Sequence, residues 1–102
     1  MLIVAIGMLA AGQVAKFDSR QPELDYTSSA RLEDVERCLI RWAAPPMVYR
    51  QPDRPDEVSI VWAGVGLSAG TAAARVDLKK DAAGTHVRSW QLTSQVQECA
   101  PK

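Results

Sequence analysis

The sequence has no surplus of charge of either sign. Twelve Lys and Arg residues balance twelve Asp and Glu residues, so the formal net charge of the 102-residue chain is +0. Proteins that bind nucleic acids neutralise phosphates with basic residues gathered on one face. The balanced composition therefore argues against a nucleic-acid partner.

Groups that catalysis or metal binding would use are scarce. The chain has one histidine, His86, and two cysteines, Cys38 and Cys99, which are not spaced as CxxC. A Ser–His–Asp or Cys–His mechanism would have to use His86. The pattern described below places this residue on the outward face of a hairpin, where a solvated histidine is the simpler interpretation. One histidine and two cysteines are too few ligands for structural zinc, and we expect no enzymatic activity, metal or cofactor.

Motifs for phosphate binding and for paired carboxylates are also lacking. The run GVGLSAG, residues 64–70, follows a predicted strand, but its spacing is GxGxxxG and no Lys-Ser or Lys-Thr pair closes it. The chain is also too short for both halves of a dinucleotide-binding fold, so we interpret the run as a hairpin connection. Carboxylates such as Asp56 and Glu57 are adjacent in sequence and point apart, whereas acid–base work on a sugar needs two that converge.

No apolar run reaches the roughly 20 residues that a membrane-spanning helix requires. Residues 1–15 contain no ionisable side chain, and the apolar run within them, residues 2–11, has the length of the hydrophobic region of a signal peptide. We predict that residues 1–15 are a signal peptide, although no Lys or Arg precedes the apolar run. A buried N-terminal strand over residues 2–6 is the alternative.

This leader contains two candidate cleavage sites. Ala10 and Gly12 stand in the A-x-A-like relation that would place cleavage before Gln13. Gln13 and Ala15 form a poorer match, with cleavage before Lys16.

The rest of the chain divides into an arm and one domain. Residues 16–28 mix charges with Pro22 and show no apolar period, so they are predicted to be a linker or an ordered arm lying on the domain. Residues 29–102 are predicted to form a single small domain, because a chain of this length has no room for a second core.

A helix is predicted after residue 28. Apolar residues recur there at the three- and four-residue spacing of one helical face. They are Leu32, Val35, Cys38, Leu39 and Trp42. Ser28 or Ser29 could cap the first turn, and Pro45 with Pro46 ends the helix because neither can donate a backbone hydrogen bond.

Two strands are predicted next. Residues 47–50 show a weak apolar–polar alternation and lie between two proline-containing segments, which suits a short edge strand. Residues 58–64, VSIVWAG, are rich in β-branched and aromatic side chains, with Val58, Ile60 and Trp62 on one face. This second strand is expected to be central.

Residues 68–80 contain many alanines, which favour helix, but their apolar side chains alternate, which favours a strand. We predict a strand, and a four-residue loop at residues 81–84 then forms a hairpin. The resulting register matches apolar with apolar and opposite charges with each other. It pairs Lys80 with Thr85, Leu78 with Val87, Asp77 with Arg88, and Arg75 with Trp90. Residues 92–99 follow as a short helix.

The two cysteines are predicted to form a disulfide. Paired cysteines in an exported protein are typical of one, and Cys38 with Cys99 allow a single intramolecular bridge. The bridge would tether the C-terminal tail to the apolar face of the helix. A free buried thiol is the alternative.

These elements predict an α+β domain. One N-terminal helix packs on an antiparallel sheet of three to four strands, and a short C-terminal tail or helix follows. We expect a small exported protein, periplasmic or secreted, that binds another protein or an envelope component without catalysis, in the manner of an inhibitor or immunity protein. A structural or assembly accessory of the cell envelope is the alternative, ahead of a small enzyme.

The outward face of the hairpin is the predicted binding surface. Arg75, Arg88 and Trp90 project from this face in the register above, and Trp and Arg are enriched at binding hot spots. The alternative is an intramolecular cation–π contact that covers the tryptophan with arginine.

Overall fold

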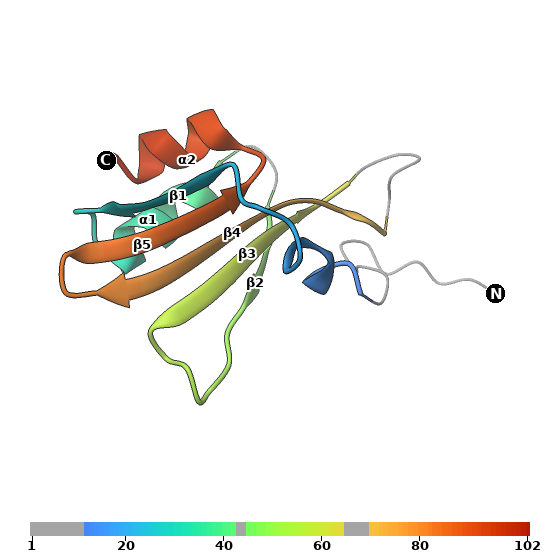
Figure 1. The fold of residues 1–102 in the computed structure, drawn as a ribbon, viewed down its shortest axis with the longest axis horizontal. Helices are drawn as coiled ribbons and strands as arrows, with labels where there is room; N and C mark the ends of the chain where they lie inside the picture. Colours follow the sequence, from blue (N-terminus) through green and yellow to red (C-terminus); the bar gives the residue numbers. More distant parts are fainter. Residues whose placement is uncertain (1–11, 43–44, 65–69) are drawn as a thin grey trace.

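The computed structural model describes residues 12–42, 45–64 and 70–102, so the predicted leader up to residue 11 and most of the glycine-containing connection lie outside the described residues. Figure 1 shows a single antiparallel sheet with helix α1 behind it. The elements in chain order are the 3₁₀ helix η1 (Ala15–Phe17), β1 (Leu24–Ser28), α1 (Leu32–Ile40), β2 (Met47–Tyr49), β3 (Glu57–Ala63), β4 (Ala72–Asp81), β5 (Gly84–Trp90) and α2 (Thr93–Cys99).

The predicted α+β class is confirmed, with five strands where three or four were expected and two helices. The strand order is β1-β5-β4-β3-β2, and every neighbouring pair is antiparallel. The predicted β4–β5 hairpin is correct in register, including Leu78 opposite Val87 and Arg75 opposite Trp90. The predicted four-residue loop is wrong, because Asp81 pairs with Gly84 and only two residues connect the strands. The alternating apolar pattern of β4 thus prevails over the helix propensity of its alanines.

The additional strand, β1, comes from the segment expected to be a linker or arm. Its side chains do alternate, but the inward positions are Leu24, Tyr26 and Ser28, so a polar residue occupies one of three core-facing sites. The Ser28 hydroxyl lies in the interior because it donates to the Pro101 carbonyl at 2.6 Å. Gly84 at the start of β5 lets the end of β1 come close, because a Cβ at this position would clash with the Ser28 carbonyl oxygen. Its φ of +140° is also a conformation that favours glycine.

Helix α1 begins later and ends earlier than predicted. Its N-cap residue is Arg31, which makes no side-chain capping bond. The predicted serine cap is wrong because Ser28 is the last residue of β1, and its Oγ accepts from the Ala30 backbone N–H. The helix buries Leu32, Val35 and Leu39 against the sheet.

The main core lies between the helices and one face of the sheet. It combines the inward side chains of the three central strands with those of both helices and Ala100. Its members are Leu32, Val35, Leu39, Val58, Ile60, Trp62, Ala74, Val76, Leu78, Val87, Val96 and Ala100. Trp42, just beyond α1, packs against this core half-buried. Leu39 of the predicted helical face and Ile60 and Trp62 of the predicted strand face therefore lie in one core.

Two isoleucines allow a direct check of this assignment of faces. Ile60→Val is expected to lower the free energy of unfolding by about 0.5–1.5 kcal/mol, because Ile60 is fully buried and the lost methylene leaves a cavity. Ile40→Val removes the same group from a side chain that is 38% exposed and should change stability by less than about 0.5 kcal/mol. Urea denaturation measures both, and equal losses would contradict the assignment.

The predicted disulfide between Cys38 and Cys99 is present, with the two Cα atoms 5.5 Å apart. It joins α1 to α2 and closes a loop across 61 positions. Cys38 is exposed, so the prediction that it lies on the apolar face is wrong: the bridge runs at the edge of the core. Its partner Cys99 is half-buried and packs against the core.

The C-terminal residues after α2 are bonded to β1. The Tyr26 hydroxyl donates to the Ala100 carbonyl, and burial raises the pKa of that hydroxyl. Together with the bond from Ser28 to Pro101, this contact covers the inward side of β1 with the end of the chain.

Candidate functional site

A second, smaller cluster of buried residues lies on the other face of the sheet. It consists of Phe17, Val61, Ala72 and Trp90, with Val14 packed against it. Residues 12–20, here called the N-terminal arm, bring Val14 and Phe17 onto this face through the 3₁₀ turn of η1. The helices therefore cover one face of the sheet, and the arm covers part of the opposite face.

Trp90 is on the outward face, as predicted, but it is not an exposed anchor. Its side chain is only 3% exposed. Phe17 packs against the indole with ring centroids 6.0 Å apart, and the indole N–H donates to the Arg20 carbonyl at 3.0 Å. The sequence signal that could have indicated this packing of the N-terminal arm is the apolar pair Val14 and Phe17, three positions apart.

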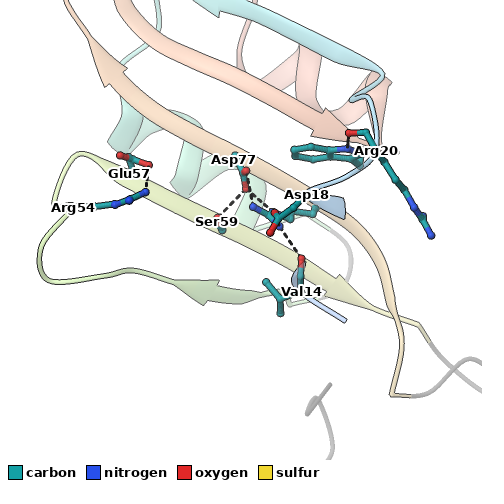
Figure 2. Close-up of polar contacts among 9 residues, drawn as sticks. Val14, Asp18, Arg20, Arg54, Glu57, Ser59 and Asp77 are labelled. Atoms are coloured by element: carbon teal, nitrogen blue, oxygen red, sulfur yellow. Dashed lines mark hydrogen bonds and ion pairs between the residues drawn. The ribbon is translucent and has the colours of Figure 1, made fainter. Parts of the chain in front are cut away.

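Arg75 fastens the arm to the sheet. Its Nη1 donates to the Val14 carbonyl and to Asp18 Oδ1, each at 2.7 Å. Its Nε and Nη2 donate to the two carboxylate oxygens of Asp77, each at 2.8 Å. Figure 2 shows Val14 and Asp18 of the arm converging with Asp77 and Ser59 of the central strands. A bidentate guanidinium–carboxylate pair of this kind is among the strong charged hydrogen bonds.

The Asp77 carboxylate completes this junction. Asp77 Oδ1 also accepts from the Ser59 hydroxyl at 2.8 Å, which links β3 to β4. Burial opposes the charge of Arg75, whose side chain is 12% exposed, but its hydrogen bonds and charge pairing with Asp77 and Asp18 raise its pKa above the usual value. The guanidinium thus stays charged and is engaged within the chain.

Arg88 lies on the other flank of Trp90. The guanidinium carbons of Arg75 and Arg88 are 5.3 and 5.2 Å from the indole centroid, so the structure brings the three predicted residues together as an intramolecular cation–π group. Arg88 keeps 42% of its side chain exposed. Its Nε lies 3.6 Å from Asp25 Oδ2 but makes no hydrogen bond within the described chain.

An open groove of about 790 Å³ lies beside the arm on this face. Its walls include Val14 and Asp18 of the arm, Tyr49 at the end of β2, and outward side chains of the three central strands. Five Arg or Lys residues line it against three Asp or Glu residues, and His86 adds an imidazole. Cationic side chains therefore predominate in the groove, although the whole chain has no net charge.

Lys79, His86 and Arg88 form the part of the groove that we call the basic strip. Lys79 is directly opposite His86 across β4 and β5, and Arg88 follows on the same face. Lys79 is exposed and has no ion pair with any residue that the structure describes. His86 Nε2 lies 2.6 Å from Asp25 Oδ1, so Asp25 is shared between the imidazole and Arg88. The strip therefore offers cationic donors that the chain itself does not fully satisfy.

The described part of the chain has neither a metal-binding cluster nor a membrane-spanning helix. Among residues 12–42, 45–64 and 70–102, no three His, Cys, Asp or Glu side chains are grouped closely enough to hold a metal ion. Within those ranges, no helix has the length and apolar character needed to cross a membrane.

The chain is thus a small, disulfide-bridged α+β protein whose antiparallel sheet carries helices on one face and an open groove on the other. Comparison with known proteins adds no family to this description: no family model, curated protein or solved structure matches the chain.

Proposed function

We propose that this chain is a small exported, non-enzymatic binding protein that holds an acidic segment of another protein in the groove beside its N-terminal arm. The observation that carries the proposal is the basic strip, in which an exposed lysine and a partly exposed arginine line an open groove on a rigid sheet. Carboxylates of a partner are the groups that such donors bind best.

The charge pattern favours one end of the groove for this contact. Arg75 already donates four of its five N–H groups to Asp77, Asp18 and the Val14 carbonyl, and only 12% of its side chain is exposed, so it offers little to a ligand. Lys79 and Arg88 are less constrained: Lys79 is exposed without an ion pair to any described residue, and 42% of the Arg88 side chain is exposed. Lys79 and Arg88 are therefore the proposed binding residues, whereas Arg75 and Trp90 are engaged within the chain.

Export is supported by the disulfide and by the uncharged leader. A disulfide persists in oxidising compartments such as the periplasm or the extracellular space. The Cys38–Cys99 bridge and the apolar run of residues 2–11 are both compatible with a periplasmic or secreted protein. An acidic segment of a soluble partner would fit an inhibitor-like role, whereas an acidic segment of a membrane complex would fit the envelope accessory.

Adjacent lysines on β4 provide the test. Lys79→Glu reverses a charge in the groove, while Lys80→Glu makes the same change on the opposite side of the strand, where Lys80 pairs with Glu33 at 3.2 Å. Oxidised wild type and both variants would be immobilised and exposed to envelope extract, and captured proteins identified by mass spectrometry. Affinity would then be measured with the purified partner.

The expected result is one stoichiometric partner held by wild type and by Lys80→Glu. Lys79→Glu should raise its Kd by about tenfold or more, which corresponds to about 1.4 kcal/mol. Added salt should weaken wild-type binding, because exposed charges are screened. A partner held equally by both variants, or one bound through a basic segment, would contradict the proposal.

A further inference from the structure

The first residues that the structure describes are part of the folded domain. Gln13 Oε1 accepts a hydrogen bond from the backbone N–H of Ala72, the first residue of β4, at 3.0 Å. The next residue, Val14, gives its carbonyl to Arg75 and its side chain to the cluster around Trp90. Gly12, one position earlier, is exposed.

We infer that the exported chain is cut between Gly12 and Gln13, so that Gln13 is the first residue of the mature protein. The inference rests on the export that we propose but not on the proposed binding. Water adds across the Gly12–Gln13 peptide bond: its hydroxyl goes to the Gly12 carbonyl carbon and its hydrogen to the Gln13 nitrogen. A membrane-bound signal peptidase is the class of catalyst that performs this hydrolysis, releasing residues 1–12.

The sequence left two sites open, and the contacts distinguish them. Cleavage between Ala15 and Lys16 would remove Gln13 and Val14 from the fold. The buried Ala72 would then lose the acceptor of its N–H, and Arg75 would lose one of its acceptors. Leaving buried donors unpaired is unfavourable. Loss of Val14 would also remove part of the cover over the cluster that contains Trp90.

Cleavage before Gln13 keeps all these contacts and uses the better-matched site. Ala10 and Gly12 supply small residues at the third and first positions before the cut, whereas the later site would place Gln13 at the third. The residues recognised by the peptidase and the residues needed by the fold therefore adjoin without overlapping. We assign the predicted signal peptide to residues 1–12 in place of 1–15.

The test is the intact mass of protein exported from the full chain with its own leader. The full-length gene is expressed in a bacterial host, and the protein is taken from the periplasm and weighed after reduction. We expect the mass of residues 13–102, or of the same chain lighter by one ammonia if the terminal glutamine has cyclised. A mass corresponding to residues 16–102, or retention of residues 1–12, would overturn the inference.

Three substitutions separate the two candidate sites. Gly12→Leu places a large side chain next to the proposed cut and should abolish processing there, while Gly12→Ala should restore it. Ala15→Leu would block the later site and should leave the mature mass unchanged apart from the substitution, since Ala15 is exposed in η1. Processing that is sensitive to Ala15→Leu and indifferent to Gly12→Leu refutes the assignment. That outcome leaves export and binding intact, whereas an unprocessed wild type refutes export as well.

Discussion

Replacing both cysteines, Cys38→Ser with Cys99→Ser, is expected to lower the free energy of unfolding by about 4 kcal/mol. On the chain-entropy model, a bridge that closes a loop of 61 positions removes about this much conformational freedom from the unfolded chain. Small domains have total stabilities of about 5–15 kcal/mol, so the loss is a large fraction of the whole.

The folded state also depends on what the bridge holds in place. Helix α2 contributes Val96 to the core, and Ala100 and Pro101 beyond it accept the hydrogen bonds from Tyr26 and Ser28 of β1. Without the bridge, local opening of α2 would expose these contacts together. We therefore expect amide hydrogen exchange to increase first in α2 and β1, and later in β3 and β4.

Urea denaturation of the oxidised protein and the double serine variant measures the effect, with the oxidised and reduced wild type as the matched pair. Cys38→Ser alone is the control for the loss of the sulfur atom at an exposed position. If its free energy of unfolding is lower than that of the reduced wild type, the difference arises from the replaced sulfur. A difference of less than about 1 kcal/mol between the oxidised protein and the double variant would contradict the prediction, as would thiol labelling of unreduced, unfolded protein.

Trp90→Ala is the second change with a large expected effect, a loss of about 3–5 kcal/mol. The indole is buried between Phe17, Arg75 and Arg88, and its N–H is bonded to the Arg20 carbonyl. Removal leaves a cavity on the outer face of the sheet and takes away the surface on which the arm packs. The arm should consequently become more sensitive to proteolysis.

Two comparison variants make this prediction specific. Trp90→Phe keeps an aromatic ring but cannot donate to Arg20, so it should be clearly less destabilising than Trp90→Ala. Tyr49→Ala also removes an aromatic ring from the same face, at a position that is 40% exposed, and should change stability by less than about 0.5 kcal/mol. Equal stability of Trp90→Ala and Tyr49→Ala would show that Trp90 is exposed and that the arm does not cover it.

The features that depend on local periodicity and turn chemistry could be predicted from the order of the amino acids alone. The β4–β5 hairpin is the clearest case, because a turn centred between Asp81 and Gly84 sets a register in which Leu78 meets Val87 and Asp77 meets Arg88. The same reasoning predicted the core strand β3, the apolar face of α1 and the pairing of the two cysteines, because few alternatives were compatible with the spacing of the residues.

The burial of polar residues, in contrast, depends on contacts between segments that are distant in the sequence. Ser28 and Thr85 are fully buried on the inward face, and each is satisfied by a carbonyl distant in sequence, Pro101 for Ser28 and Ala30 for Thr85. Such residues interrupt the apolar alternation by which strands are recognised, and their partners are defined only after the chain has folded. This is why β1 was predicted to be a linker or arm.

The same distinction explains the candidate site. The hairpin register placed Arg75, Arg88 and Trp90 correctly on one outward face, but whether that face is open depends on what else packs there. The arm reaches it from more than fifty positions away in sequence, through the bonds of Gln13 to Ala72 and Val14 to Arg75. Periodicity determines which way a side chain points, whereas burial depends on the distant segments that cover it, and here they bury Trp90 and leave Lys79 exposed.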